Sequence, residues 1–131
     1  MSAAARPFPE PVAPDFADFF SGLSQRRLTV RRCAGCEAIQ WPPRPVCSRC
    51  HGDEFRPAVI GDRGTVYTFT VCHRGFHPWF AERVPYAIVV TDLGDGIRLT
   101  GNYLGDDLDG LRCGLAVRAE YVGSCLGWVP A

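Results

Sequence analysis

The chain has 131 residues, 47% of them hydrophobic, and its 14 arginines balance 14 acidic residues without any lysine. This length suits one small domain with or without an appendage, and the hydrophobic content excludes a disordered tail. No apolar run reaches the roughly 20 residues of a membrane helix. The first 14 residues also lack the apolar segment of a signal peptide, so we expect a soluble cytoplasmic protein.

Residues 1–27 are predicted to form a proline-rich arm followed by a short helix. Asp15 stands where it can cap that helix, directly after Pro14. Apolar residues then recur at the spacing of one helical face: Phe16, Phe19, Phe20 and Leu23. Such a face either packs on the protein's own core or docks on a partner chain, and the sequence leaves both readings open.

Residues 28–60 carry two cysteine pairs with the spacing of a metal site. Each pair has two intervening residues, and ten residues separate the pairs: Cys33, Cys36, Cys47 and Cys50. Two such knuckles from adjacent hairpins can surround one ion with four thiolates. The pattern predicts a zinc ribbon, with iron in the same sulfur cage as the alternative. Strands are expected at 28–32, 38–41 and 55–60.

A site whose four positions are all filled by protein leaves no place for water or substrate, so we expect a structural zinc. His51 could replace a cysteine, but four thiolates already satisfy the ion. Neighbouring arginines could offset the charge of the thiolates: Arg31, Arg32, Arg44 and Arg49. The other three cysteines are expected to be ordinary buried thiols: Cys72, Cys113 and Cys125.

Residues 61–131 alternate short strands with turn signals at a spacing typical of a small β-barrel or sandwich. Strands are predicted at 65–72, 86–93, 97–104, 115–122 and 126–129, with an acidic turn at 105–110. In the first of them, strict alternation places Tyr67, Phe69 and Val71 on one face.

Residues 75–85 are predicted to form a loop that holds Phe76, Trp79 and Phe80. It serves either as a plug over one barrel end or as a binding surface. His73, Arg74 and His77 border this loop and suit ligand or partner contact better than covalent chemistry. Cys72 and His73 are neighbours on a strand and point to opposite faces, which argues against a nucleophile–base pair. No phosphate-binding loop, nucleophile elbow or catalytic zinc motif occurs.

The order of helix, cysteine ribbon and barrel resembles a known family. The barrel strings are Gly64-Thr-Val-Tyr-Thr-Phe-Thr-Val-Cys-His-Arg74, Pro85-Tyr-Ala-Ile-Val-Val90 and Arg98-Leu-Thr-Gly-Asn102. Together they are similar to bacterial and archaeal proteins that join a rubredoxin-like zinc ribbon to an OB-fold and are often described as acyl-CoA-associated. The resemblance implies a mainly β fold: a short N-terminal helix, a four-cysteine zinc ribbon and a five-stranded OB-fold barrel.

The resemblance also implies an accessory subunit. Family members are partners of lipid-transfer-type thiolases and aldolases that act on acyl-CoA thioesters, so we expect a hetero-oligomer in which this chain stabilises the catalytic subunit and shapes the CoA-thioester channel. A complex with a MaoC-like enoyl-CoA hydratase is an alternative. No catalytic residue maps onto this chain, and its zinc would be structural.

Contacts to the partner or to acyl-CoA are expected from the aromatic helix and loop: Phe16, Phe19, Phe20, Arg74, Phe76, Trp79 and Phe80. The cluster at 26–32 offers further arginines for an anionic ligand. A single-stranded nucleic-acid-binding protein is a competing hypothesis, because Tyr67 and Phe69 would share a face suited to stacked bases. Residues 65–131 carry a net charge of −2 from five arginines and seven acidic residues, which weighs against it.

Overall fold

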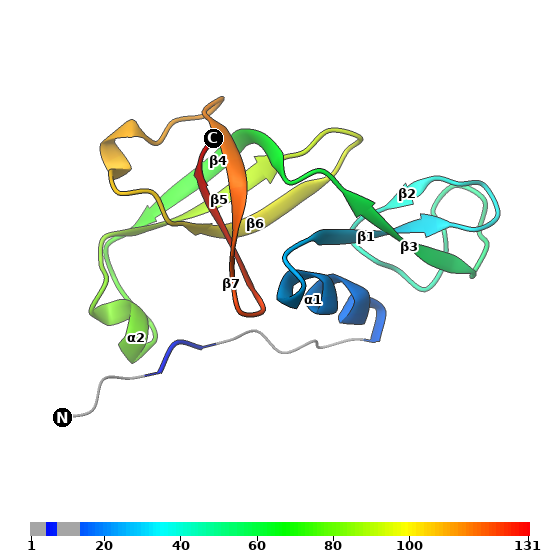
Figure 1. Ribbon diagram of the computed structural model, residues 1–131, viewed down its shortest axis with the longest axis horizontal. Coiled ribbons are helices and arrows are strands. Elements are labelled where there is room, and N and C mark those ends of the chain that lie inside the picture. The colour runs from blue at the N-terminus through cyan, green and yellow to red at the C-terminus, as the bar shows by residue number, and fades with distance from the viewer. Residues whose placement is uncertain (1–4, 8–13) are drawn as a thin grey trace.

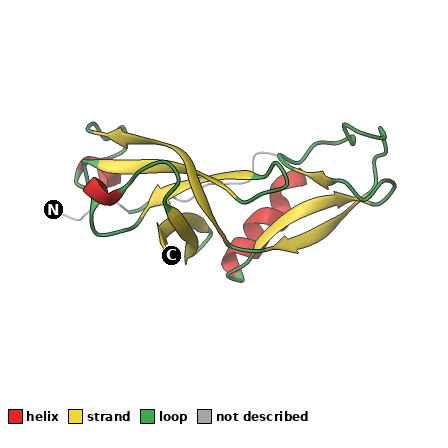
Figure 2. Cartoon of the chain, turned by 90° about the horizontal axis from the view of Figure 1, so that it is seen from above, coloured by secondary structure: helices red, strands yellow, loops and turns green. Residues whose placement is uncertain are grey.

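A computed structural model describes residues 5–7 and 14–131 as a three-stranded sheet, a closed five-stranded barrel and a helix between them (Figure 1). The predicted arm falls largely on residues 1–4 and 8–13, outside the described part. The mainly β fold class is confirmed. Seen from above, the helix lies at the junction of the two sheets along the long axis (Figure 2).

The helix begins later than predicted and without the predicted cap. A 3-10 turn, Pro14–Phe16, leads into α1, Ala17–Ser24, and the residue at the cap position is Phe16, with no side-chain hydrogen bond. Asp15 is not a cap. Its Oδ1 instead accepts a hydrogen bond from Arg31 Nη1 at 3.0 Å, because a charged partner on the adjacent strand binds a carboxylate more strongly than a backbone amide does.

The cysteine module is built on an antiparallel sheet in the order β2-β1-β3. Its strands are β1, Leu28–Cys33; β2, Ile39–Gln40; and β3, Phe55–Ile60. Cys33 pairs with Phe55 and Leu28 with Ile60 across β1 and β3. The first metal-ligand candidate therefore stands at the end of the central strand.

The barrel closes in the order β4-β5-β6-β8-β7, with β6 and β8 parallel and the other pairs antiparallel. Its strands are β4, Arg63–Cys72; β5, Tyr86–Asp92; β6, Arg98–Tyr103; β7, Ala116–Val122; and β8, Cys125–Pro130. All five predicted barrel strands are present, with ends that differ by one or two residues.

A β-bulge between Val66 and Thr68 corrects the predicted faces of β4. Val66 is 2% exposed and Phe69 packs against the core, whereas Tyr67 is 50% exposed. An extra residue in one strand inverts the alternation beyond it, which simple period-two reasoning does not anticipate. Tyr67 and Phe69 consequently do not share the face required by the nucleic-acid hypothesis.

The predicted aromatic loop contains a one-turn helix, α2, Pro78–Ala81. His77 caps it, because its Nδ1 accepts a hydrogen bond from the Trp79 backbone N–H at 3.1 Å. The acidic turn holds a 3-10 turn, Leu108–Gly110. In α2, Pro78 occupies the first helical position, where a backbone N–H would have had no partner within the helix.

One continuous core joins the cysteine module to the barrel. It includes Leu23 of α1, Leu28 and Val30 of β1, and Val89 and Trp128 of the barrel, each at most 1% exposed. α1 contacts β1 on one side and β7 and β8 on the other. No helix in the described ranges is long and apolar enough to cross a membrane.

Candidate functional site

The four predicted ligands converge on one point at the tip of the cysteine module. The sulfurs of Cys33, Cys36, Cys47 and Cys50 all lie within 4.8 Å of one another. Cys33 Sγ and Cys50 Sγ are 3.5 Å apart, and Cys36 Sγ and Cys47 Sγ are 3.7 Å apart. A tetrahedron with Zn–S bonds of about 2.3 Å has sulfur–sulfur edges of about 3.8 Å, so the cluster has the dimensions of a zinc site.

The two knuckles have the same backbone structure. The N–H of Glu37 donates to the carbonyl of Cys33 at 2.9 Å, and the N–H of His51 donates to the carbonyl of Cys47 at 3.0 Å. Glu37 and His51 both take left-handed backbone conformations, with φ of 65° and 64°. His51 is thus the turn residue of the second knuckle, and within residues 5–7 and 14–131 the cluster of possible metal ligands consists of these four cysteines.

Polar hydrogens point at the sulfurs and stabilise thiolates. Gln40 Nε2 donates to the buried Cys47 Sγ at 3.2 Å, and the backbone N–H of Arg49 donates to the same sulfur at 3.4 Å. Backbone hydrogen bonds from Cys50 and Arg49 lower the pKa of Cys47 to about 6. Burial opposes this shift, and the hydrogen bonds outweigh it.

Cys50 behaves in the opposite way. The Gly52 N–H lowers the pKa of Cys50, but the neighbouring thiols of Cys33 and Cys36 outweigh it and raise that pKa to about 11. Thiolates packed this closely repel one another, so they require a cation to ionise together. Four converging cysteines with N–H donors therefore fit a structural zinc, and the same sulfur geometry also admits iron.

The remaining cysteines are not uniformly buried, which corrects one expectation. Cys125 is buried in the barrel and Cys72 is half-buried, but Cys113 is exposed. Cys113 follows the acidic turn and precedes β7, where no strand pairing covers it. Burial of a cysteine in a connection depends on what packs over it, and the sequence does not show that.

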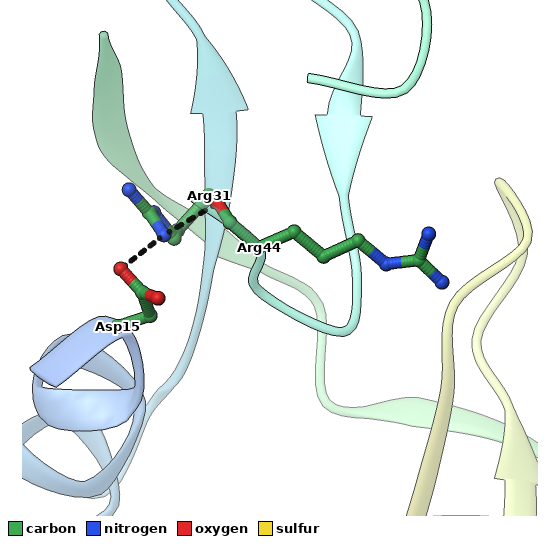
Figure 3. Close-up of polar contacts among 3 residues, drawn as sticks. All are labelled: Asp15, Arg31 and Arg44. Carbon is green, nitrogen blue, oxygen red and sulfur yellow. Dashed lines mark hydrogen bonds and ion pairs between the residues drawn. The ribbon is translucent and has the colours of Figure 1, made fainter. Parts of the chain in front are cut away.

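The arginines near the cysteine module do not form one cluster. Arg31 Nη1 donates to Asp15 Oδ1 at 3.0 Å and to the carbonyl of Arg44 at 3.2 Å (Figure 3). Arg32 Nη1 donates to the carbonyl of Glu37 at 2.8 Å, and the Arg26 guanidinium lies 5.7 Å from the Tyr121 ring centroid. These side chains connect elements of the fold and face different partners.

The aromatic residues at the start of α1 and in the turn before it contact both Trp41 of the cysteine module and the shared core. The Phe19 ring lies 4.8 Å from the Trp41 ring and the Phe16 ring lies 6.0 Å from it, measured between centroids. Phe19 and Phe20 are half-buried and pack against the core, and their rings are 5.4 Å apart. The partial burial leaves the outer edges of these rings accessible.

A groove of about 350 Å³, here called the α1 groove, runs between α1 and the outside of the barrel. Phe19, Phe20 and Leu23 form one wall, and Ile88 and Thr100 of the barrel form the other. Phe80 of the aromatic loop closes one end. The tertiary structure thus brings together the two aromatic segments that the sequence identified separately.

A second groove of about 250 Å³, here called the α2 groove, continues past Phe80. Two arginines contact the Trp79 ring in this groove: the Arg83 guanidinium lies 3.6 Å from the ring centroid, and the Arg6 guanidinium lies 4.9 Å from it. Phe80 also packs on Tyr86 with centroids 4.7 Å apart. Stacked guanidinium groups keep their edge N–H donors available for an anion.

Other predicted contact residues lie elsewhere. Phe16 borders neither groove, and Phe76 is 84% exposed with the Arg74 guanidinium 5.2 Å from its ring centroid. Sequence reasoning missed Arg6, Arg83 and Ile88 as groove residues. Ile88 alternates with buried neighbours in β5, a pattern that marks it as outward-facing, whereas no local signal distinguishes the two arginines.

Comparison with known proteins agrees with this architecture. Residues 20–56 match the family model "ChsH2, rubredoxin-like zinc ribbon domain", and residues 58–122 match "ChsH2, C-terminal OB-fold domain". A solved structure described as Ltp2-ChsH2(DUF35) aldolase has a chain with a TM-score of 0.81 and 29% identity, and the match covers 93% of this chain and 98% of that one.

Curated relatives carry different names. The probable enoyl-CoA hydratase alpha subunit of Thermomonospora curvata is 33% identical over 119 residues, 91% of this chain. The DUF35 domain-containing scaffold protein of Methanocaldococcus jannaschii is 30% identical over 91 residues, 69% of this chain. The chain spans 36% of the length of the former protein and 64% of the latter.

Proposed function

Because the chain belongs to the ChsH2 family, in which a rubredoxin-like zinc ribbon precedes an OB-fold, we propose that it is an accessory subunit of an acyl-CoA thiolase- or aldolase-type complex. In this role it stabilises the catalytic partner and contributes to the channel for the CoA thioester. The likeness to the ChsH2(DUF35) chain of an aldolase, over nearly the full length of both chains, is the observation that carries the proposal.

The α1 groove supports a role in protein–protein contact. Aromatic residues half-buried around a groove are the type of anchor on which interfaces depend. Ile88 adds an aliphatic side chain that is 38% exposed, and Thr100 and Asn102 add uncharged neighbours from β6. Among the described residues that line this groove, Arg6 alone is charged, and so low a charge is typical of the buried centre of an interface.

The zinc ribbon supports the same role indirectly. Its four ligands are all protein thiols, so its contribution is to hold β1, β2 and the connection to β3 in place. β1 in turn packs against α1, which forms one wall of the α1 groove. Loss of the metal therefore disturbs the proposed docking surface without touching any reacting atom.

Contact with acyl-CoA, within this proposal, comes from the aromatic end of the barrel. The guanidinium groups of Arg83 and Arg74 each lie near an aromatic ring. Arg83 Nη1 donates to the carbonyl of Trp79 at 2.7 Å, which leaves the other N–H groups of that guanidinium for a phosphate. In the assembled complex, Arg83→Ala and Arg74→Ala should each raise the Michaelis constant for acyl-CoA. An unchanged constant for both variants contradicts a CoA contact at this end.

The interface is tested with two matched substitutions. Ile88→Arg places a charge in the α1 groove, whereas Val59→Arg places the same charge on β3, where Val59 is 62% exposed. Size-exclusion chromatography with a purified Ltp2-type aldolase should show co-elution for the wild type and for Val59→Arg, and separate peaks for Ile88→Arg. Failure of the wild type to co-elute contradicts the proposal, and loss only with Val59→Arg places the interface on the ribbon.

A hydratase complex is the second candidate, and the name of the Thermomonospora relative favours it. The two candidates differ in the catalytic subunit that is retained. Competition between a MaoC-like hydratase and an Ltp2-type aldolase for the tagged wild-type chain distinguishes them: retention of the hydratase alone favours the second candidate, and retention of the aldolase alone favours the first.

A further inference from the structure

Residues 5–7 of the chain itself lie in the proposed docking surface. Arg6 and Pro7 line the α1 groove together with Phe19, Phe20 and Phe80. The Arg6 guanidinium lies 4.9 Å from the centroid of the Trp79 ring, in the adjoining α2 groove. Figure 1 shows this blue segment beside α2, at the end of the molecule away from the start of α1.

The chain length permits this placement. Seven peptide steps separate Pro7 from Pro14, which begins the turn before α1, and extended chain spans about 24 Å over that length. α1 has eight residues and is about 12 Å long. The number of intervening residues therefore permits residues 5–7 to lie at the far end of the groove from the start of α1.

We propose that residues 5–7 act as an intramolecular strap that covers the α1 groove and must leave it before another protein can dock there. This inference rests on the proposed function, because the groove is the docking surface assigned above. Within the described residues, the strap contacts the fold through the cation–π interaction of the half-buried Arg6 with Trp79, and the exposed Pro7 lines the groove beside it. A tethered segment competes efficiently with a free partner, since its effective concentration reaches about the millimolar range.

The contact is also weak enough to be displaced. A cation–π pair at a partly exposed site changes an equilibrium by about two- to fivefold. The apparent association constant for a partner equals the intrinsic constant multiplied by the fraction of molecules in which the groove is open. The strap therefore lowers partner affinity modestly and shields the aromatic rings while the subunit is unpaired.

The test uses Arg6→Ala and a chain that starts at Phe8, which removes the strap altogether. Arg63→Ala is the control, because Arg63 is an exposed arginine on β4 and lines neither groove. The first measurement is the fluorescence of an apolar dye, anilinonaphthalene sulfonate, with the isolated chain. Uncovering the rings should raise dye binding for both strap variants and leave the control unchanged.

The second measurement is the dissociation constant for a purified Ltp2-type aldolase. Arg6→Ala should tighten binding by about two- to fivefold, and the shortened chain by at least as much. Unchanged dye binding in both strap variants overturns the strap, and weaker aldolase binding also overturns it, because residues 5–7 would then belong to the interface. Raised dye binding with no aldolase binding by any chain supports the strap's cover of the groove and counts against the proposed function alone.

Discussion

At the scale of single residues, the candidate metal centre depends on a few close contacts around the cysteine sulfurs at the tip of the ribbon. The sulfurs of Cys33 and Cys50 approach to 3.5 Å, and Gln40 donates to Cys47 from the floor of the sheet. Gly52 also belongs to this arrangement, because a Cβ there would lie 3.3 Å from Cys50 Sγ. The two left-handed turn residues, Glu37 and His51, follow directly after the two cysteine pairs.

Replacement of one ligand tests the structural role of the metal. Cys47→Ser should abolish stoichiometric zinc binding and unfold the ribbon, since structural zinc contributes about 10–16 kcal/mol to the folding of small zinc modules. Cys113→Ser, at an exposed cysteine outside the cluster, is the control and should bind zinc normally. Metal analysis and circular dichroism provide the measurements, and a fully folded, metal-free Cys47→Ser protein would contradict the prediction.

Acidification should release the metal. The ordinary thiol pKa is 9.0 and that of Cys47 is about 6, so between these values the unfolded chain binds a proton that the folded chain does not. Stability from this group therefore rises with pH across that window and is lost as the pH falls through about 6. Zinc requires the same thiolates, so a colorimetric chelator should report zinc release that increases as the pH falls. Release that is independent of pH between 9 and 5 would refute this.

Arg31 joins three segments that are distant in the sequence. Its guanidinium contacts Asp15, the carbonyl of Arg44 and the ring of Phe55, whose centroid lies 4.0 Å away. The side chains of Arg31 and Asp15 are 16% and 30% exposed, so water screens this pair less than a surface pair. The pair thereby anchors the turn that precedes α1 to the ribbon sheet.

Arg31→Met should lower the free energy of unfolding by about 1–2 kcal/mol, because it leaves a partly buried carboxylate and a carbonyl without their donor. The matched control is Arg56→Met, which removes the ion pair with Glu37 at side chains that are 51% and 71% exposed. Arg56→Met should lower the free energy of unfolding by less than about 0.5 kcal/mol. Chemical denaturation of both variants decides, and equal losses would mean that burial does not distinguish the two pairs.

At the scale of elements, the barrel depends on close approach between its first two strands. Gly64 lies in β4 opposite Val117 of β7 and against the end of β5. A Cβ at Gly64 would overlap the carbonyl oxygen of Asp92 and lie 2.9 Å from Thr91 Cγ2. The β4 bulge begins at Val66, two residues after Gly64, and the Val66 side chain is buried in the core. One short segment of β4 therefore sets both the closure and the register of the barrel.

Gly64→Ala should destabilise the barrel by about 1–3 kcal/mol, since backbone atoms of β5 must shift to admit the methyl group. Gly61→Ala is the control in the preceding turn, where a Cβ would meet nothing within 4 Å. It should change stability by less than about 1 kcal/mol, with a small gain expected from the reduced entropy of the unfolded chain. Thermal unfolding of the two variants gives the comparison, and indistinguishable midpoints would contradict it.

At the scale of the whole molecule, α1 connects the metal module to the barrel. Leu23 is 1% exposed and belongs to the core that also contains Leu28 and Val30 of β1 and Trp128 of β8. The hydrogen bond from the Tyr121 hydroxyl to Asp62 Oδ2, at 3.4 Å, lies on the barrel side of the same junction, where Arg26 faces the Tyr121 ring. Desolvation by burial, reinforced by Asp62, raises the pKa of Tyr121 to about 12, so this hydroxyl remains a donor at neutral pH.

Leu23→Ala should lower the free energy of unfolding by about 2–5 kcal/mol and weaken the coupling between ribbon and barrel. Differential scanning calorimetry should show one transition for the wild type, as expected from the shared core, and a broadened or divided transition for Leu23→Ala. Val46→Ala removes a side chain that is 46% exposed in the ribbon and should leave one sharp transition. A single unshifted transition for Leu23→Ala would show that the two parts do not fold through this contact.

The amino-acid sequence alone determined the features that depend on local spacing. Two residues between cysteines place both thiols of a knuckle on one ion, so the ligands Cys33, Cys36, Cys47 and Cys50 were predictable, and alternation with turn residues located the barrel strands. Only the tertiary structure decided which partner Asp15 takes, which face Tyr67 occupies, and that Phe20 and Phe80 border one groove. These outcomes depend on contacts between distant segments and on a one-residue bulge, and neither leaves a periodic signal in the sequence.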